Sequence, residues 1–364
     1  MPGPRHARRR FLHRVATTAA TLPPLIDRAF AAPPAKPRIR IGQIGVKHAH
    51  SGKIAVYRDS PDYQVMGLVE PDDEAFAAAV RQPAFAGLPR LTRDELLRTD
   101  GLQAALVETE VRDLLDNAEA CVAAGLHVHI DKPAGESLPQ FARILDMAHR
   151  RGLVVQMGYM LRYNPGVVLL RELLAGNVLG DIFEVHAVMS KVVPPRDRTA
   201  LAAYPGGIMF DLGCHVIDLV IGVLGRPDKV TGYNRHSASC ADGLLDNMLA
   251  VLEYPRATAT VRSSAIEVEG FARRQLTVCG TEGTLHVQPL DSPKATLALA
   301  GPRGGYQAGS QEIALPRYVR YVDDAADMAR CIRGEKTFAF SREHDLAVQS
   351  TLLAACGLDP GATP

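Results

Sequence analysis

The stretch IRIGQIGVKHAH, residues 39–50, is a short apolar run that ends in a glycine and is followed by a polar turn. A short apolar run bounded by a turn signal is typical of a buried β-strand. From residue 38 onward, such runs alternate with helical patterns, and this alternation predicts βαβ units and a doubly wound parallel sheet covered by helices on both faces. The predicted strands are 39–45, 64–70, 103–109, 127–131 and 154–159, and the predicted helices are 49–59, 73–81, 94–98, 113–124 and 137–151.

The alternation of strand and helix patterns ends after a helix expected at 165–175. Strand-like segments then follow one another with few helices between them, which is typical of an antiparallel sheet. The length of 364 residues also favours two domains. We therefore predict a Rossmann-type dinucleotide-binding domain over 38–160, and an α+β domain over 161–358 whose open, mostly antiparallel sheet has helices on one face. The expected strands of the second domain are 182–193, 230–236, 248–254, 258–267, 274–279 and 284–288. Its expected helices are 207–224, 323–332 and 342–356. The last two helices can pack back on the first domain.

The charges are unevenly distributed along the chain. Six of the 41 basic residues and one of the 40 acidic residues lie within 1–31, so the formal charge of +1 becomes −4 without this segment. Arg8-Arg9-Arg10-Phe11-Leu12, a weakly apolar middle and a small-residue exit at 29–31 are typical of a secretory signal of the twin-arginine type. We therefore expect a signal peptide over 1–31, a Pro-rich tether over 32–37, and a periplasmic or extracellular location. A basic disordered arm is the alternative.

Composition excludes several other classes of protein. No run of 18 or more apolar residues occurs, which argues against a transmembrane helix. The near-neutral charge gives no reason to expect a nucleic-acid partner. The six cysteines show no C-x-x-C pattern and no regular spacing, so we expect free thiols, no disulfides and no metal.

The turn after the first strand is the candidate cofactor loop. A dinucleotide fingerprint reads G-x-G-x-x-G there, so that the backbone can approach a pyrophosphate. Gly45 keeps the first glycine, while Lys47 and His50 take the other two positions, and a lysine can compensate electrostatically. Glu70 ends the second strand, where an acid accepts hydrogen bonds from the adenosine ribose and disfavours a 2′-phosphate. This pattern favours NAD over NADP.

Three later motifs carry polar groups that are costly to bury without purpose. Asp131-Lys132-Pro133 follows the strand at 127–131, and the carboxyl ends of parallel strands are where open α/β sheets bind ligands. Arg162-Tyr163-Asn164-Pro165 follows the strand at 154–159. The third motif, Gly206-Gly207-x-x-x-Asp211-x-Gly213-x-His215-x-x-Asp218, opens a long apolar helix, and its Asp211 and His215 share one helix face at a spacing of four.

These motifs, together with Gly280-Thr-Glu-Gly-Thr, resemble those of the Gfo/Idh/MocA family from about Ile39 to Leu358. The resemblance implies an NAD(P)-dependent oxidoreductase that acts mainly on sugars, sugar acids and inositols, and that forms a homo-oligomer, a dimer or tetramer, through its C-terminal sheet. It implies that Lys132 holds the reacting oxygen between nicotinamide and substrate, that His215 is the acid/base, and that Asp211 is its polar partner. The residues implied for the cofactor are Gly45, Lys47, His48, Glu70, Thr109, Asp131, Lys132 and Arg162, and those implied for the substrate are Tyr163, Asn164, Asp211 and His215.

Two departures from the family pattern leave alternatives open. The fingerprint keeps one glycine, and the family's Thr-Pro-Asn-x-x-His loop is here Thr109-Glu-Val-Arg-Asp-Leu114. A cofactor-poor, ligand-binding member is therefore possible. Because an exported protein meets no soluble NAD pool, either the cofactor stays bound or the net reaction is redox-neutral, as in an epimerase or an NAD-using glycosidase.

The paired histidines suggest a different class of protein. His48-x-His50 with His127, His129 and Asp131 is compatible with a metal-dependent hydrolase of barrel type. Against this reading, the second half shows no eight-fold βα repeat.

Overall fold

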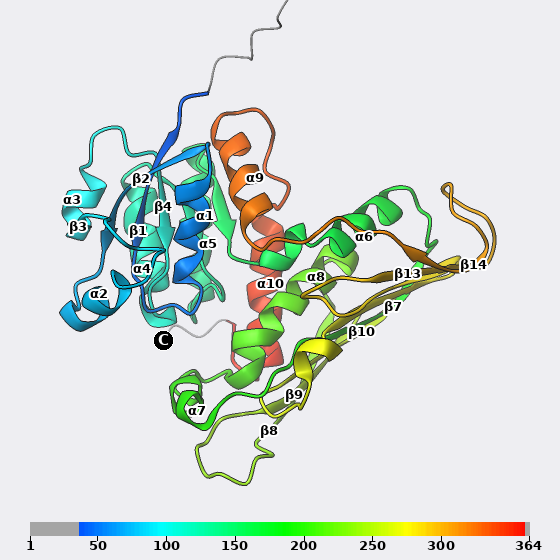
Figure 1. Ribbon diagram of the computed structural model, residues 1–364. Helices are drawn as coiled ribbons and strands as arrows, with labels where there is room; N and C mark the ends of the chain where they lie inside the picture. Colours follow the sequence, from blue (N-terminus) through cyan, green and yellow to red (C-terminus); the bar gives the residue numbers. More distant parts are fainter. Residues whose placement is uncertain (1–35, 361–364) are drawn as a thin grey trace, which may run out of the picture. The chain divides into compact units, whose positions relative to one another are not determined.

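The computed structural model describes residues 36–360 of the 364-residue chain, and the fold begins with strand β1, Ile39–Ile44 (Figure 1). The expected signal peptide, 1–31, and residues 32–35 of the expected tether lie outside the described residues. Within 36–360, no helix combines the length and the apolar character that a membrane crossing needs.

Six parallel strands form the first sheet, in the order β3-β2-β1-β4-β5-β6. This is the strand order of a Rossmann fold, so the predicted fold class of this half is confirmed. The remaining strands are β2 (Tyr63–Val69), β3 (Arg90–Leu91), β4 (Ala104–Val107), β5 (His127–Ile130) and β6 (Val155–Met157). The sequence did not predict β3, because a strand of two residues has no hydrophobic period to recognise.

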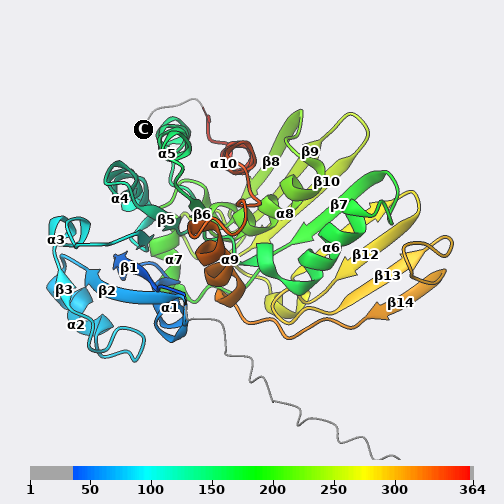
Figure 2. The same cartoon turned by 90° about the horizontal axis from the view of Figure 1, so that it is seen from above.

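Helices cover both faces of this sheet (Figure 2). α4 (Val111–Ala123) and α5 (Leu138–Arg150) pack on one face through apolar side chains spaced three or four residues apart. α1 (Ile54–Asp59) packs on the other face with α9 (Val322–Ile332), which comes from the far end of the chain. The Tyr63 hydroxyl in β2 donates a 2.7 Å hydrogen bond to the Ala325 carbonyl oxygen in α9, so a late helix completes the first domain. The short helices α2 (Asp73–Ala79) and α3 (Arg93–Leu97) follow β2 and β3.

Eight strands form the second sheet, in the order β14-β13-β12-β11-β7-β10-β9-β8. All neighbours are antiparallel except β7 and β10, which confirms the prediction of an open, mostly antiparallel sheet. The strands are β7 (Ile182–Val188), β8 (Lys229–Arg235), β9 (Asn247–Glu253), β10 (Thr258–Ser264), β11 (Gln275–Gly280), β12 (Gly283–Val287), β13 (Ala295–Leu299) and β14 (Gly309–Ile313). The sequence missed β13 and β14, and the polar, exposed residues of β14 are those of an edge strand.

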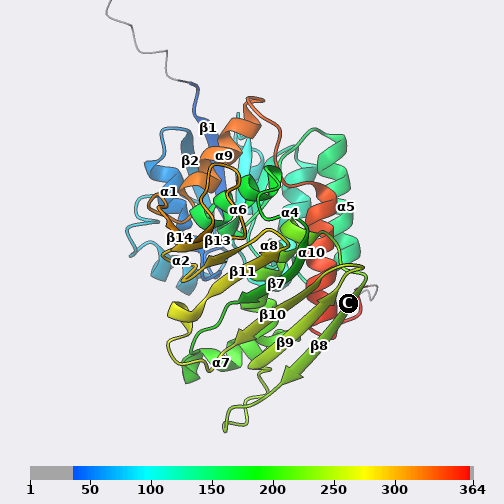
Figure 3. The same ribbon diagram turned by 90° about the vertical axis from the view of Figure 1, so that its right-hand side faces the viewer.

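Helices α6 (Pro165–Ala175), α8 (Cys214–Leu224) and α10 (Arg342–Ala355) lie on one face of the larger sheet (Figure 2). Figure 3 shows the opposite face, which no helix of the described residues covers. A helix that the sequence did not predict, α7 (Pro195–Ala202), buries little apolar surface, which explains its weak signal.

The helix predicted over 207–224 is divided in two. Met209–Gly213 form a wide π-type turn, η3, and the α-helical part begins at Cys214. Gly207 precedes the turn with a φ of 52°, and a Cβ atom there would lie 2.5 Å from the Leu245 carbonyl oxygen. Single π-turns are frequent at functional sites. Here the turn carries Asp211, and His215 follows in the first turn of α8.

Candidate active site

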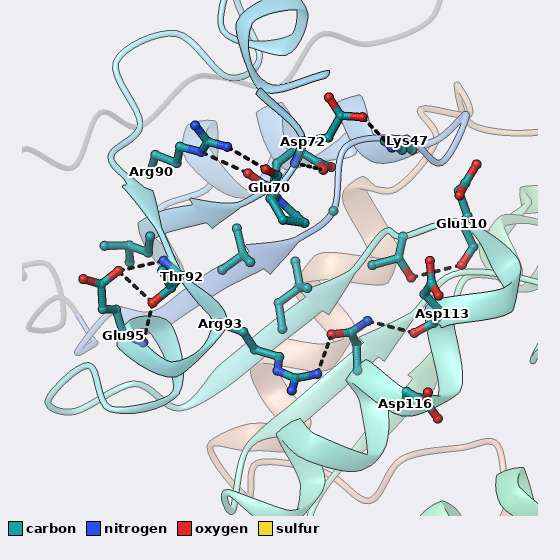
Figure 4. A pocket seen from close by; sticks show the side chains of 17 residues that line it. Lys47, Glu70, Asp72, Arg90, Thr92, Arg93, Glu95, Glu110, Asp113 and Asp116 are labelled. Carbon is teal, nitrogen blue, oxygen red and sulfur yellow. Dashed lines mark hydrogen bonds and ion pairs between the residues drawn. The ribbon is translucent and has the colours of Figure 1, made fainter. Parts of the chain in front are cut away.

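A groove of about 760 Å³ runs along the carboxyl ends of β1, β2 and β4 (Figure 4). Four of the residues that the family resemblance assigned to the cofactor line it: Gly45, Lys47, Glu70 and Thr109. The other lining side chains come mainly from the ends of β2 and β3 and from the first turns of α3 and α4. This is the edge at which open α/β sheets bind nucleotides.

The turn after β1 keeps its shape although two fingerprint glycines are missing. Gly45 has a φ of 90°, and a Cβ atom there would lie 2.7 Å from backbone atoms of both Glu108 and Thr109. Glu70 holds the turn from the side, since its Oε2 accepts a 3.2 Å hydrogen bond from the Val46 N–H. A backbone this close to the sheet edge, with a buried carboxylate beside it, fits the adenosine half of NAD.

Lys47 extends along the rim of the same groove. Its Nζ lies 2.8 Å from Asp72 Oδ2, and both side chains are about 40% exposed (Figure 4). Asp72 also caps α2 by accepting hydrogen bonds from the N–H groups of Glu74 and Ala75. The lysine is therefore paired with an acid in this structure, and it is accessible for a phosphate.

A second polar centre joins the two domains. Lys132, the second residue after β5, donates hydrogen bonds from Nζ to Asp211 Oδ1 at 2.9 Å and to the Asp211 carbonyl oxygen at 2.8 Å. Lys191, which the sequence analysis missed, lies 3.4 Å from Asp211 Oδ2. Burial opposes the charged form of Lys132, but Asp211 outweighs it and raises the pKa of Lys132 above its ordinary value. Burial would raise the pKa of Asp211, yet Lys132 and Lys191 lower it well below its usual range. The pair is therefore ionised at neutral pH.

His215 lies beside this pair and is almost fully buried. Its Nδ1 has no hydrogen-bond partner among the described residues, and its ring is 6.3 Å from that of His50 and 6.1 Å from that of Tyr159, centre to centre. Burial, reinforced by Lys132 and His50, lowers the pKa of His215 well below its ordinary value. His215 is therefore neutral at pH 7 and able to accept a proton.

A buried network of charges lies beneath the centre. His48 Nδ1 is 2.6 Å and His50 Nδ1 is 3.2 Å from Asp131 Oδ2. Lys53 Nζ lies 3.2 Å from the same oxygen and 3.0 Å from Glu108 Oε1. His48 and Asp131 thus face inward rather than lining the groove. They clamp the peptide of Lys132, whose carbonyl oxygen is 3.2 Å from His48 Nε2 and whose N–H donates a 2.7 Å hydrogen bond to Asp131 Oδ1.

Sequence reasoning missed Lys53 and Glu108. Lys53 is fully buried at the start of α1, and Glu108 follows β4 directly. A usable signal existed for Glu108, since an acid at the carboxyl end of a buried parallel strand points to the ligand edge. For Lys53, nothing in the local pattern distinguishes it from a solvated helix residue.

The polar side chains of the motif at 162–164 make hydrogen bonds within the fold. Arg162 is 1% exposed and donates hydrogen bonds to Asp218 Oδ1 at 2.6 Å and to Asp345 Oδ1 at 2.5 Å. It therefore links η2 (Met160–Tyr163), α8 and α10, and it is not among the residues that line the groove. Burial opposes its charge, but the two acids raise the pKa of Arg162 further.

Tyr163 and Asn164 are also bound internally. The Asn164 side chain accepts a 2.8 Å hydrogen bond from the Gly166 N–H, which caps α6, and it donates one of 2.7 Å to the Leu290 carbonyl oxygen. The Tyr163 hydroxyl donates a 2.8 Å hydrogen bond to Asp327 in α9. The cofactor role expected for Arg162 and the substrate roles expected for Tyr163 and Asn164 stay predictions, and in this structure their polar groups bind other parts of the chain.

Two family models match this chain. One, described as an oxidoreductase family with an NAD-binding Rossmann fold, matches residues 39–159. The other, described as a GFO/IDH/MocA C-terminal domain, matches residues 167–286. Together the models follow the two domains in order, and they confirm the resemblance that the motifs indicated.

Three individual proteins that resemble this chain are 26%, 19% and 24% identical to it in sequence. Trans-1,2-dihydrobenzene-1,2-diol dehydrogenase of Sus scrofa is 26% identical over 196 residues, which are 53% of this chain and 57% of that enzyme, so the chain matches little more than half of that relative's length. UDP-N-acetylglucosamine 3-dehydrogenase GnnA from Acidithiobacillus ferrooxidans has a TM-score of 0.74 at 19% identity and covers 89% of this chain and 99% of its own. GenD2 from gentamicin A biosynthesis, solved in complex with NAD, has a TM-score of 0.72 at 24% identity and covers 88% and 94%. The two solved structures share the fold.

Proposed function

We propose that this chain, which belongs to the Gfo/Idh/MocA family of oxidoreductases, transfers hydride between a CH–OH group of a sugar, sugar acid or inositol-type polyol and NAD. The observation that carries the proposal is the Lys132–Asp211 ion pair beside neutral His215, at the carboxyl edge of the Rossmann sheet. A fixed cation and a proton acceptor are the two groups that oxidation of an alcohol requires of the protein.

His215, Lys132 and Asp211 have different roles in the proposed reaction. NAD, when bound, supplies the hydride acceptor. His215 accepts the proton of the substrate hydroxyl, and in the reverse direction it returns that proton. Lys132 donates a hydrogen bond to the reacting oxygen, whose developing negative charge it stabilises by a few kcal/mol. Asp211 keeps Lys132 charged and oriented, so it is a positioning residue rather than a proton carrier.

The groove residues support NAD as the cofactor. Glu70 is buried at the end of β2 and Asp72 follows it, so a ribose diol meets acceptors there, whereas a 2′-phosphate meets like charge. Gly45, Lys47 and Thr109 would hold the cofactor from β1 and β4. The named activities of the relatives, a diol dehydrogenase and a nucleotide-sugar 3-dehydrogenase, support a substrate with adjacent hydroxyl groups on a ring.

Export through the twin-arginine route is also part of the proposal. The signal at 1–31 supports it, and replacing both Arg8 and Arg9 by lysine should retain the protein in the cytoplasm. An exported enzyme has no soluble NAD pool, so the cofactor would stay bound through each cycle. The second candidate reaction, a redox-neutral one in which the hydride returns to the product, is supported by the same signal.

We further propose a homo-oligomer, a dimer or tetramer, that assembles through the uncovered face of the larger sheet. Tyr233 in β8 is 48% exposed and pairs with Leu249 of β9, on the face opposite to that of the buried Ala250 and Leu252, and such exposure is unusual for a large apolar side chain in a sheet. Light scattering of the purified protein should give two or four times the chain mass, and a monomer at micromolar concentration would reject this part of the proposal.

One experiment tests the hydride transfer directly. The exported protein is purified without added cofactor and denatured, and the nicotinamide released is measured by mass spectrometry. In parallel, UDP-N-acetylglucosamine, glucose, gluconate and myo-inositol are assayed for reduced nicotinamide formation, with Lys132→Met and His215→Asn as negative controls. We expect near-stoichiometric NAD and turnover with at least one of these compounds. Protein that neither releases nor binds NAD would instead favour a ligand-binding role.

A further inference from the structure

The motif His48-x-His50 is not used by the proposed hydride transfer, although its side chains meet two acids beneath the site. One ring nitrogen each of His48 and His50 and a carboxylate oxygen of Asp131 lie within 4.8 Å of one another. His127 and His129, which the sequence grouped with them, are bound elsewhere. His127 Nδ1 accepts a hydrogen bond from the Val154 N–H, and His129 contacts Lys53 and Gln156.

The contacts of His48 determine where its proton lies. Nε2 is 3.2 Å from the Lys132 carbonyl oxygen, and since a carbonyl oxygen can only accept, Nε2 carries the hydrogen. The backbone N–H of His50 donates to Nδ1 at 3.3 Å, which requires a lone pair on Nδ1. That lone pair then faces Asp131 Oδ2 at 2.6 Å. At this distance the two atoms share a proton or a metal ion, so a metal ion that binds here displaces the proton between Nδ1 and Oδ2.

Glu108 places a second hydrogen-bond acceptor without a donor next to His48 and Asp131. Its Oε1 is paired with Lys53 at 3.0 Å, but its fully buried Oε2 has no hydrogen-bond partner among the described residues and lies 4.0 Å from His48 Nδ1. Asp131 and Glu108 bring two carboxyl groups to this place, and Lys53 contacts both of them. A buried carboxyl oxygen without a partner is costly, so Glu108 Oε2 is free to become a ligand of an ion that binds beside Asp131.

We propose that His48, His50, Asp131 and Glu108 form a binding site for one divalent transition-metal ion of the zinc type. Two imidazole nitrogens and two carboxylate oxygens are a donor set that Zn²⁺ and its first-row neighbours accept. The hydrogen bond from His48 Nε2 to a backbone carbonyl oxygen is the outer contact that metal-binding histidines usually make. The site differs from the expectation of no metal, which rested on cysteine spacing and on the missing barrel repeat.

Because of where the proposed metal site lies, a bound ion would affect the proposed hydride transfer. His48 and Asp131 clamp the peptide of Lys132 on both sides, and the His50 ring is 6.3 Å from that of His215. An ion here fixes the backbone of the catalytic lysine. It also adds positive potential next to the place where the proposed mechanism develops negative charge.

The test uses Zn²⁺ and Co²⁺ as probes on the full-length protein after a chelator has removed bound metal. Calorimetry should show one Zn²⁺ per chain, and Co²⁺ should give the visible absorption of a low-coordinate site. His50→Ala should weaken Zn²⁺ binding by about a hundredfold or more, and Glu108→Gln by about tenfold. The matched control is His186→Ala, a histidine on the outer face of the larger sheet, which should bind as the parent does. Thermal unfolding of each variant verifies that it is folded.

A readout that needs no variant guards against misfolding. Cu²⁺ loaded into the stripped parent protein should show hyperfine coupling to two imidazole nitrogens by electron paramagnetic resonance. Two outcomes overturn the proposal. One is the absence of saturable binding at micromolar metal, which would mean that a proton occupies the cluster. The other is binding that survives His50→Ala. NAD release is measured separately, so failure of the metal site and failure of the proposed function remain distinguishable.

Discussion

The ammonium group of Lys132 lies 2.9 Å from Oδ1 and 2.8 Å from the carbonyl oxygen of Asp211, a residue 79 positions away in the other domain. One residue thus accepts two hydrogen bonds from the same lysine, and the π-type turn at Met209–Gly213 presents its carbonyl and carboxylate oxygens together. The contact fixes Lys132 and keeps it charged, which the proposed hydride transfer requires.

Asp211→Asn should therefore change the pH dependence of turnover. Burial lowers the pKa of a lysine and Asp211 opposes that effect, so removal of the carboxylate charge allows the pKa of Lys132 to fall. We expect the alkaline limb of the kcat/KM profile to move to lower pH and the plateau to fall about tenfold or more. The profile is measured with the compound that the sugar assay identifies. The exposed Asp197→Asn is the control, and an unchanged profile in Asp211→Asn would exclude the positioning role.

Gly45→Ala should damage both stability and cofactor binding. A Cβ atom would lie 2.7 Å from backbone atoms of Glu108 and Thr109, at a φ of 90° that alanine rarely adopts. We expect a loss of about 2 to 3 kcal/mol in the free energy of unfolding, measured with urea, and weaker NAD binding. Gly52→Ala is the matched control, since nothing lies within 4 Å of its Cβ position. Equal behaviour of the two variants would contradict this account of the turn.

Glu70→Gln should shift the cofactor preference toward NADP. The amide oxygen can still accept the hydrogen bond from Val46, while the charge that opposes a 2′-phosphate is removed. We expect the ratio of the NADP and NAD dissociation constants to fall by about tenfold, or ~1.4 kcal/mol. Asp73→Asn, whose parent side chain is exposed and paired with Arg90, should leave this ratio unchanged. An unchanged ratio of the two dissociation constants in Glu70→Gln would show that the adenosine ribose does not bind at Glu70.

Arg162→Met should unfold the protein more easily without altering cofactor affinity. The change leaves the carboxylates of Asp218 and Asp345 buried without their shared partner, which typically costs about 3 to 5 kcal/mol. Arg256→Met removes an exposed ion pair with Asp181 and should cost less than about 1 kcal/mol. Denaturant unfolding gives both values. A large loss of NAD affinity in folded Arg162→Met would restore the cofactor role that the family resemblance implied.

Asp324 should make the protein less stable as the pH rises. Burial, with Lys53 opposing, raises the pKa of Asp324 to about 7, and one of its carboxylate oxygens has no partner. The unfolded chain releases this proton near pH ~3.9. Between these values the folded state binds more protons than the unfolded state, so stability falls as the pH rises and the full cost is present above pH ~7.

Asp324→Asn should abolish that loss and be more stable than the parent at pH ~8 by up to about 4 kcal/mol, with the difference vanishing near pH ~4. Thermal or urea unfolding across this range measures it. Asp323→Asn, at the exposed neighbouring position, should follow the parent curve. A constant difference across pH would show that the effect is not ionisation.

The sequence by itself determined the fold class and indicated the family, while its domain bounds and its site residues stay predictions. Periodic apolar runs predicted the parallel strands, and the spacing of Asp211 and His215 predicted that both lie on one helical segment, because these patterns reflect local geometry. The groove residues Gly45, Lys47, Glu70 and Thr109 follow the ends of neighbouring strands, so their convergence at one sheet edge was also predictable. The order of the strands in the parallel sheet brings these four residues together.

Tertiary structure decided what the polar groups do once they meet. From the sequence, Arg162 and Asn164 resemble cleft residues, yet Arg162 satisfies two buried acids and Asn164 caps a helix. Lys53 resembles a solvated lysine, yet it is buried between Glu108 and Asp131. The reason is physical. The free energy of a buried charge depends on partners that come from distant parts of the chain, and no local pattern specifies which carboxylate a folded chain will bring within 3 Å.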